Sequence, residues 1–249
     1  MSLKETVIVV DANHFLHRYY HTIKDNVEKI VSLYRFRLLN FMQFHKPKSI
    51  HICFDEGGSD YRRQLLPTYK SNRPPMPDDM RVIKHKLIRE SLQITSKVYI
   101  SRGIEADDII ASLCKRLKTE YDVIILTCDK DLNQLIDDSV RIIHPFKLTE
   151  STKNNLRFTM GVDPHQVVDY LSMVGDTVDY INGIPDIGKS RAIRLLTQYD
   201  TLDGLLSMEN SNEPYLPMLL RFKSRLDINR KLITLLDDLP VDNYLIQNN

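Results

Sequence analysis

Two clusters of carboxylates, and the apolar segments between them, constrain the fold of this chain most strongly. The first cluster lies in Gly103–Asp108 and the second in Asp129–Asp131. Between them stand an amphipathic run, Ile109–Leu117, and a short apolar run, Val123–Leu126. This order predicts a loop, a helix, a buried strand and a second loop. At the start of this helix, Glu105 and Asp108 would lie on the same face because they are three residues apart.

Two earlier apolar runs also end in a carboxylate. Val7–Val10 is followed by Asp11, and Ile50–Phe54 is followed by Asp55. Continuous apolar runs are typical of central strands in a parallel sheet, and the carboxyl ends of parallel strands meet at one edge. Two shorter strands are expected at 98–100 and 140–143.

Helical segments alternate with these strands. Val27–Phe44 has helical apolar spacing, and a further helix is expected over Asp79–Ile94, with Asp78 as its cap. The alternation predicts an α/β fold, with a mostly parallel sheet and helices on both faces. From about Asp163 the chain becomes helical, ending in one helix over Tyr215–Leu236.

Gathered carboxylates need a physical reason, because like charges repel and raise each other's pKa. A divalent cation removes that cost, and an all-oxygen ligand set suits Mg²⁺ or Mn²⁺ better than zinc. Helix capping explains Glu105 and Asp107 on their own equally well. The second cluster and the acids at the strand ends favour the metal site.

Composition sets wide bounds. The chain has 249 residues and a net charge of +1, so its bulk charge indicates no partner. Three cysteines, an odd number, lie in apolar runs at Cys53, Cys114 and Cys128, which predicts buried, reduced thiols in a cytosolic compartment. No signal peptide and no membrane span are expected.

The segment from Tyr61 to Arg102 is locally basic. It contains ten Lys or Arg against three acids, a net charge of +7, with Tyr61 and Tyr69 interleaved. Cations and aromatic rings together suit a phosphate backbone and base stacking. A solvated helix face explains the cations between Lys84 and Arg89. It explains Tyr69–Arg73 less well, because that segment runs into prolines that prevent a regular helix.

His14, His17 and His21 have helical spacing that could be mistaken for a metal site. A solvated or hydrogen-bonded helix face is the favoured interpretation, because a zinc site also needs supporting partners for its ligands.

A glycine-bounded hairpin follows two further acids, Asp176 and Asp179. It runs from Gly183 to Gly188 and opens a helix, so backbone N–H groups are left for an anion. Lys189, Arg191 and Arg194 add charge. The pattern favours a helix–hairpin–helix clamp on a DNA phosphate, with an ordinary αα-hairpin as the alternative. The P-loop spacing is present, but no strand precedes it, so we reject a P-loop.

The ordered set of these segments resembles the 5′-3′ exonuclease and flap endonuclease family, and most closely the 5′-nuclease domain of bacterial DNA polymerase I. The matching segments, in chain order, are Val10-Asp11, Phe54-Asp55, Tyr69–Asp79, Gly103–Asp108, Asp129–Asp131, Gly175-Asp176 with Asp179, and the Gly183–Lys189 hairpin. The resemblance spans nearly the whole chain. It leaves no residues for a polymerase, so it implies a free-standing nuclease.

The resemblance implies a PIN-like nuclease core at 1–162, with a helical arch at about 61–97. A helical DNA-binding subdomain at 163–249 would contain a helix–three-turn–helix motif at about 175–198.

It also implies hydrolysis of phosphodiester bonds with two Mg²⁺ ions, which Mn²⁺ can replace, and a potassium ion at the hairpin. The first ion would be held, partly through water, by Asp11, Asp55, Glu105, Asp107 and Asp108. The second would be held by Asp129, Asp131, Asp176 and Asp179. Lys70 and Arg73 would contact the scissile phosphate and Tyr69 would stack on a base. Further DNA contacts are assigned to Arg18, Arg81, Gly183, Gly188, Lys189 and Arg191.

The implied substrate is DNA with a 5′ flap, a nick or a free 5′ end, including RNA–DNA hybrids. The protein would be a monomer that acts in replication and repair in the bacterial cytoplasm, at the nucleoid or encoded by a phage. The chain departs from the family pattern at Ala12, where glycine is usual, and at Val178, Tyr180 and Asn182, which replace Ser, Asn and Pro. The last three departures affect the second ion and the turn that would bind potassium.

The sequence is also compatible with two other functions. A PIN-type endoribonuclease shares the acid-edged sheet but lacks the basic region and the hairpin. A catalytically silent protein that binds DNA junctions would keep the hairpin without needing the acids.

Overall fold

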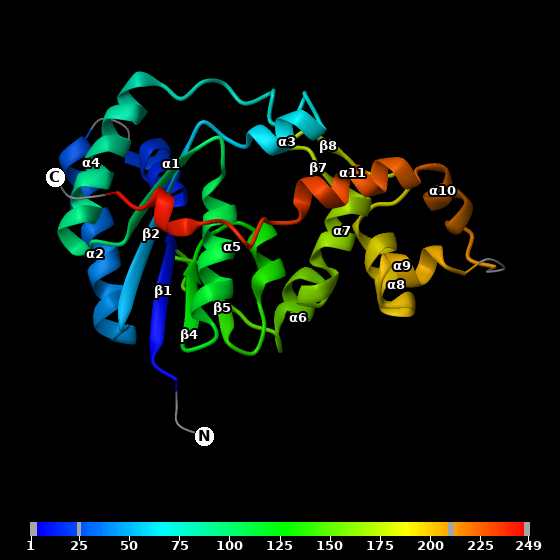
Figure 1. Cartoon of the computed structure of the whole chain (residues 1–249). Coiled ribbons are helices and arrows are strands. Elements are labelled where there is room, and N and C mark those ends of the chain that lie inside the picture. Colours follow the sequence, from blue (N-terminus) through cyan, green and yellow to red (C-terminus); the bar gives the residue numbers. More distant parts are fainter. Residues whose placement is uncertain (1–3, 24–25, 209–211, 247–249) are drawn as a thin grey trace. The chain divides into compact units, whose positions relative to one another are not determined.

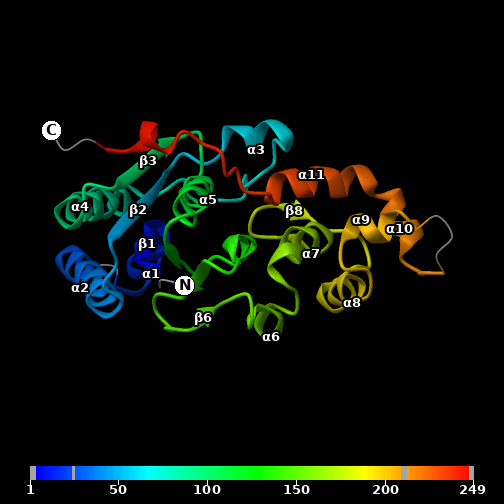
Figure 2. The same ribbon diagram turned by 60° about the horizontal axis from the view of Figure 1, so that its bottom comes forward.

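The computed structural model describes residues 4–23, 26–208 and 212–246, and divides into two compact units (Figures 1 and 2). Unit 1 comprises residues 1–59, 75–152 and 236–249, and unit 2 comprises 60–74 and 153–235. This division differs from a single boundary at residue 162. Segment 60–74 belongs with the C-terminal helices, and the last segment belongs with the sheet, where the Ile246 amide donates to the Val98 carbonyl at 2.9 Å.

Unit 1 is built on a six-stranded sheet in the order β3-β2-β1-β4-β5-β6. The strands are β1 (Thr6–Asp11), β2 (Ser49–Glu56), β3 (Val98–Arg102), β4 (Asp122–Leu126), β5 (Val140–Ile143) and β6 (Glu150–Ser151). The first five pair in parallel and only β6 is antiparallel. The predicted parallel α/β sheet is therefore confirmed.

Helices cover both faces of this sheet (Figure 1). They are α1 (Ala12–Ile23), α2 (Val27–His45), α4 (Asp78–Ile94) and α5 (Ala106–Leu117), with 3₁₀ turns η1 (Asp131–Leu135) and η3 (Val241–Tyr244). Side chains alternate between the faces of a strand, so Ile8 and Val10 join the core beneath α1, α2 and α4. Helix α5 packs on the opposite face, against β1 and β2.

The region expected to form an arch contains α3 (Asp60–Leu65), an irregular segment at 66–77, and α4. Helix α4 packs against α1 and α2 and buries Met80, Ile83 and Leu87, so it belongs to the helix layer of unit 1. Asp78 is its first residue and not its cap, because Pro77 occupies the cap position and the Asp78 carboxylate pairs with Arg81 at 3.1 Å.

Unit 2 is helical (Figure 2). Besides α3, it contains α6 (Leu156–Met160), η2 (Pro164–Gln166), α7 (Val167–Val174), α8 (Lys189–Tyr199), α9 (Leu202–Leu206), α10 (Leu216–Arg221) and α11 (Lys223–Ile233), with a two-stranded ribbon of β7 (Gly175–Asp176) and β8 (Ile181–Asn182). The single helix expected over Tyr215–Leu236 was wrong. Phe222, with φ −103° and ψ 19°, interrupts it and separates α10 from α11.

Two of the three cysteines are buried as predicted, Cys53 and Cys114, whereas Cys128 is exposed because it follows the end of β4. Among the described residues, none of the helices combines the length and the apolarity that a membrane span requires.

The buried histidine of β2 predicts an acid-sensitive core. His51 is 2% exposed, its ring nitrogens lie 3.1 Å from Ser49 Oγ and Tyr99 Oη, and burial lowers its pKa to about 3, with Lys97 and Arg116 adding to the effect. The unfolded chain binds this proton near pH 6.5, so stability is lost as pH falls from 6.5 toward 3.

Between pH 7 and pH 5, we expect the free energy of unfolding of the wild-type protein to fall by about 2 kcal/mol more than that of His51→Gln, since each pKa unit corresponds to about 1.4 kcal/mol. Urea unfolding of both proteins at the two pH values measures this difference. Equal losses would show that another group controls acid stability.

Candidate active site

The carboxyl edge of the sheet in unit 1 gathers seven acids. Asp11 ends β1 and is level with Cys53 of β2, while Asp55 of β2 is level with Ser101 of β3. The cluster of residues 105–108 follows β3 and the cluster of residues 129–131 follows β4, whose Leu126 pairs with Val10. The acids at this edge are Asp11, Asp55, Glu105, Asp107, Asp108, Asp129 and Asp131.

Asp11 is the most enclosed of the strand-end acids, at 2% exposed. Its carboxylate accepts hydrogen bonds from His14 Nδ1 and, at 2.9 Å, from Thr127 Oγ1. Burial alone would raise the pKa of Asp11, but the charge and hydrogen bond of His14 and the bond from Thr127 outweigh it and lower that pKa.

His14 is the cationic partner of Asp11 at this edge. Burial lowers its pKa, but the Asp11 carboxylate, assisted by Asp129 and Asp55, raises it to about 9, so the ring is protonated at neutral pH. His17 and His21 instead stack on each other, with ring centroids 6.3 Å apart. The structure therefore shows a hydrogen-bonded His14 and an exposed, stacked pair of His17 and His21, in agreement with a solvated or hydrogen-bonded helix face.

Asp55 is oriented by three neighbouring groups. Its Oδ1 accepts the Ala106 amide at 2.5 Å, at the N-terminus of α5, where the helix dipole favours negative charge. Its own amide donates to Asn13 Oδ1 at 3.2 Å, and its carbonyl accepts from Lys84 Nζ. The start of α5 is thus fixed relative to the end of β2.

The three acids at the start of α5 have different surroundings. Glu105 is 3% exposed and occupies the N-cap position, but its side chain makes no capping hydrogen bond, so capping does not explain it. Asp107 is half-buried. Asp108 is fully buried, and its Oδ1 accepts the Leu236 amide at 2.9 Å. At least one oxygen of Asp108 therefore fastens the C-terminal segment to α5.

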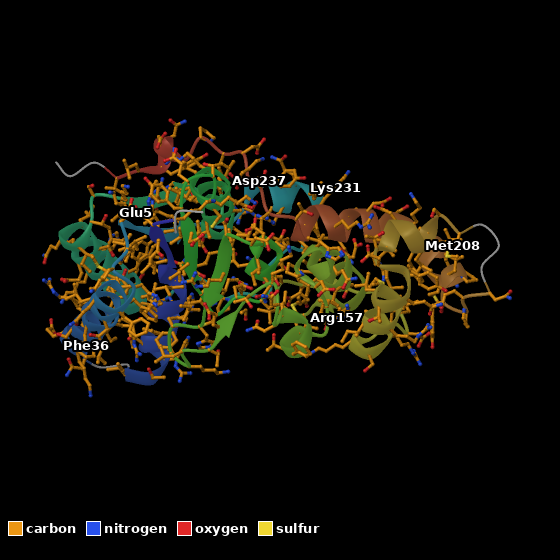
Figure 3. All side chains as sticks on the ribbon, turned by 90° about the horizontal axis from the view of Figure 1, so that it is seen from below. Glu5, Phe36, Arg157, Met208, Lys231 and Asp237 are labelled. Carbon is orange, nitrogen blue, oxygen red and sulfur yellow. The ribbon has the colours of Figure 1, made fainter. Side chains whose placement is uncertain are left out.

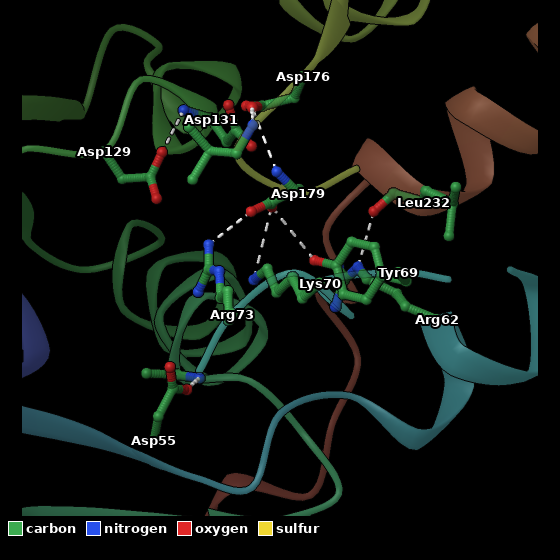
Figure 4. A network of polar contacts seen from close by, with 12 residues as sticks. Asp55, Arg62, Tyr69, Lys70, Arg73, Asp129, Asp131, Asp176, Asp179 and Leu232 are labelled. Atoms are coloured by element: carbon green, nitrogen blue, oxygen red, sulfur yellow. Dashed lines mark hydrogen bonds and ion pairs between the residues drawn. The ribbon is translucent and has the colours of Figure 1, made fainter. Parts of the chain in front are cut away.

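The second cluster forms a compact turn after β4. The Asp129 amide donates to Thr127 Oγ1 at 3.0 Å, and Asp129 Oδ1 accepts the Asp131 amide at 2.9 Å (Figure 4). Lys130 Nζ lies 3.2 Å from Asp131 Oδ1. The predicted turn at this strand end is present.

In unit 2, the carboxylate of Asp179 lies beside Lys70 and Arg73, the two cations predicted to contact phosphate (Figure 4). Asp179, 8% exposed, pairs with Arg73 at 2.5 Å and with Lys70 at 3.5 Å, and accepts from the Tyr69 hydroxyl at 3.4 Å. The Lys70 amide also donates to the Asp179 carbonyl at 3.1 Å. Asp176 Oδ1 accepts the Val178 amide at 2.8 Å, which shapes the turn between the two acids.

Tyr69 has no exposed ring face for a base in this state. It is 6% exposed, and Lys70 Nζ lies 5.0 Å from its ring centroid. The stacking role given to Tyr69 therefore requires Lys70 to move.

The two glycines of the hairpin differ in role. A Cβ on Gly183 would lie 2.2 Å from the Val174 carbonyl oxygen, so this glycine permits close backbone packing. A Cβ on Gly188, at the N-terminus of α8, would meet nothing within 4 Å. Lys189 and Arg191 are exposed on the first turn of α8, and Arg191 donates to the Asp186 carbonyl.

The remaining predicted DNA contacts are exposed on helices of unit 1. The Arg18 guanidinium on α1 lies 5.8 Å from the Phe146 ring centroid, and Arg81 on α4 pairs with Asp78. Two further residues of these sites were not predicted from the sequence. Thr127 binds Asp11 and Asp129, and Arg62 is buried in unit 2. For Thr127 the signal was its place directly before the second acid cluster.

Comparisons with known proteins agree along the whole chain. The family description "5'-3' exonuclease, N-terminal resolvase-like domain" matches residues 6–169, and "5'-3' exonuclease, C-terminal SAM fold" matches residues 162–247. A 5'-3' exonuclease of Mycoplasmopsis pulmonis is 34% identical over 219 residues, which cover 85% of this chain and 73% of that protein.

DNA polymerase I of Borreliella burgdorferi is 30% identical over 257 residues, covering 96% of this chain but only 28% of the polymerase. Among solved structures, the bacteriophage T5 D15 flap endonuclease, a pseudo-enzyme–product complex with DNA and metal ions, is similar with a TM-score of 0.76 and 21% identity. The match covers 95% of this chain and 90% of that chain. At this identity the structural likeness supports the fold.

The different surroundings of Asp107 and Asp108 predict different effects on stability. Asp108→Ala leaves the Leu236 amide without its acceptor, which costs about 1–3 kcal/mol. Asp107→Ala changes a half-buried side chain and is expected to stay within about 0.5 kcal/mol of wild type. Urea unfolding in EDTA compares the two, and equal losses would contradict the fastening role of Asp108.

Proposed function

The chain belongs to the 5′-3′ exonuclease family of nucleases, and from this premise we propose that it is a structure-specific 5′ nuclease. Its substrates are branched or nicked DNA, and it cleaves their phosphodiester bonds as a flap endonuclease or 5′-3′ exonuclease. The observation that carries this proposal is the row of acids at the carboxyl edge of the sheet, with Asp11 and Asp55 held in place by His14 and α5.

The donor set fits divalent cations. Every side chain proposed as a ligand offers carboxylate oxygens, the ligands that Mg²⁺ and Mn²⁺ prefer. We assign the first ion to Asp11, Asp55, Glu105 and Asp107, with Asp108 acting through its neighbours. The family pattern assigns a second ion to Asp129, Asp131, Asp176 and Asp179, and we keep that assignment on donor chemistry alone. When bound, two such ions supply an activated water and stabilise the leaving oxygen.

The protein's own groups orient these acids. His14, protonated at neutral pH, offsets the charge of Asp11 and holds its carboxylate together with Thr127. The N-terminus of α5 does the same for Asp55. The carboxylates therefore keep their directions before any cation arrives, which lowers the cost of assembling the site.

Lys70 and Arg73 are the proposed contacts to the scissile phosphate. Both cations pair with Asp179 in this state, so an entering phosphate competes with that carboxylate for them. Arg73 presents a planar fork that matches phosphate oxygens, whereas Lys70 acts as a point charge.

Gly188, Lys189 and Arg191 form the proposed clamp for a duplex strand. Helix α8 is 11 residues long, a Cβ on Gly188 at its N-terminus would meet nothing within 4 Å, and both cations are exposed. Contacts of this kind position DNA without reading its sequence.

The potassium ion implied by the resemblance finds less support. The Ile184 carbonyl accepts the Ile187 amide at 3.1 Å, and the Asp186 carbonyl accepts from Arg191. Two carbonyls of the turn thus each already accept a hydrogen bond, and the proposed reaction does not require potassium.

The biological role we propose is removal of flaps and RNA primers by a monomer in bacterial cytoplasm, in replication and repair. A silent junction-binding protein is the second candidate, because the clamp would bind DNA without chemistry. An endoribonuclease is the third, since it needs the acid edge alone.

The proposed function is tested with a 5′-labelled flap duplex in Mg²⁺ and in EDTA, beside a 3′-flap duplex and an RNA hairpin. Cleavage near the 5′-flap junction that requires metal supports the proposal. Binding without cleavage would favour the junction-binding protein, and cleavage of RNA alone would favour the endoribonuclease.

Loss of single acids is expected to separate chemistry from DNA binding. Asp107→Ala and Asp129→Ala should each lower single-turnover cleavage by about 100-fold or more, since even supporting residues of a metal site contribute about 10- to 100-fold. DNA affinity measured in EDTA should stay within about twofold, because the proposed clamp lies on α8.

Glu120→Ala, which removes an exposed carboxylate remote from the sheet edge, is the matched control. Calorimetric titration with Mn²⁺ gives a readout independent of cleavage and should show weaker binding for both acid variants only. Cleavage unchanged by loss of Asp107 or Asp129 would contradict the assigned site.

A further inference from the structure

Arg62 is the largest fully buried side chain in the described part of the molecule. It lies on α3 and is 1% exposed. Its Nε donates to the Leu232 carbonyl at 2.7 Å (Figure 4). Its Nη2 donates to the Thr234 carbonyl at 3.3 Å. Its neighbour Arg63 is exposed and pairs with Asp60 at 2.7 Å.

The carbonyls that Arg62 meets explain how a guanidinium can be buried here. Leu232 lies in the last turn of α11, where carbonyls lack an intrahelical partner and the helix dipole is negative. Lys231 on the same turn is exposed (Figure 3), so it leaves these carbonyls to Arg62. Arg62 therefore acts as the cap of α11, supplied from a segment remote in sequence.

A contribution to folding stability does not by itself explain why a guanidinium is buried at this position. Burying a guanidinium costs several kcal/mol of desolvation, and apolar replacements of buried charges are often neutral or stabilising. An arginine adds a fixed orientation, because its planar guanidinium can bind two particular carbonyls at once and so orient α3 relative to them.

The fastening at Arg62 continues along the chain to the proposed phosphate contacts. The Leu66 amide donates to the Arg62 carbonyl at 2.9 Å, and the Tyr69 amide donates to the Leu66 carbonyl at 2.8 Å. The Arg73 amide then donates to the Lys70 carbonyl at 3.1 Å. These turns connect the segment that presents Lys70 and Arg73 to the end of α3.

We propose that Arg62 is a positioning residue for phosphodiester cleavage: it holds α3 on the end of α11 and thereby sets where Lys70 and Arg73 stand. This inference rests on the proposed function of those two cations. At its other end the side chains of Lys70, Arg73 and Tyr69 contact the Asp179 carboxylate, and phosphate would compete for them. The Lys70 amide also donates to the Asp179 carbonyl at 3.1 Å. The hydrogen bonds of Arg62 to the Leu232 and Thr234 carbonyls involve none of the groups for which phosphate would compete.

The test compares Arg62→Met and Arg62→Lys with Arg63→Met as the matched control. Three quantities are measured: single-turnover cleavage of a 5′-flap duplex at saturating enzyme, DNA affinity in EDTA, and hydrogen–deuterium exchange of residues 66–74. Misplacing a catalytic group by about 1 Å can cost about 100-fold in rate. We therefore expect Arg62→Met to cleave at least about tenfold more slowly.

The pattern across readouts distinguishes positioning from general destabilisation. Arg62→Met should keep DNA affinity within about twofold and exchange faster at residues 66–74 but not in the sheet. Arg62→Lys, which keeps the charge and loses the fork, should recover part of the rate, and Arg63→Met should match wild type.

Two results would overturn the inference while leaving the proposed function intact: wild-type cleavage by a folded Arg62→Met, or a loss of rate accompanied by faster exchange throughout both units. Absence of cleavage by the unaltered protein would instead overturn the proposed function, and the role of Arg62 in cleavage with it.

Discussion

The parallel register of β1 with β2 and β4 is the constraint on which the acid edge depends. Since all three strands point the same way, the residue after each apolar run arrives at the same edge. The sheet thereby concentrates negative charge where the backbone cannot move apart to relieve it. Partners from the following elements offset that charge, namely His14 of α1, Thr127 after β4, and the first amide of α5.

A second charge balance is set up within unit 2. There a buried carboxylate, Asp179, is neutralised by two cations of a segment more than a hundred residues earlier, and one of those cations also covers the Tyr69 ring. Such a pair is stable while both partners are present, and leaving one buried charge alone is costly. An anion that drew Arg73 and Lys70 away would therefore leave the Asp179 carboxylate without these two cations.

How far the sequence predicted these features depends on whether their causes are local. The strands were predicted well because burial on both faces leaves continuous apolar runs, as at Val7–Val10 and Val123–Leu126. Acids that follow such runs could be placed at one edge by the same logic. Arg62 could not be found, since in a basic stretch it resembles a solvated cation, and its acceptors lie 170 and 172 positions away. The hydrogen-bond partner of Asp108 is likewise 128 positions away. The helix break at Phe222 could not be predicted either, because neither that position nor its neighbours are glycine or proline.

The division of the chain into two units limits which genetic crossovers between homologous genes keep each unit intact. The polypeptide passes from one unit to the other between residues 59 and 60, 74 and 75, 152 and 153, and 235 and 236. A single genetic crossover between two homologous nucleases, anywhere between codons 74 and 152, would therefore join a segment bearing Arg62, Lys70 and Arg73 to helices from the other parent. Only exchanges that carry both pieces of unit 2 together keep Lys70, Arg73 and their partner Asp179 from the same parent. Lineages of such enzymes should accordingly inherit residues 60–74 and 153–235 as one linked block.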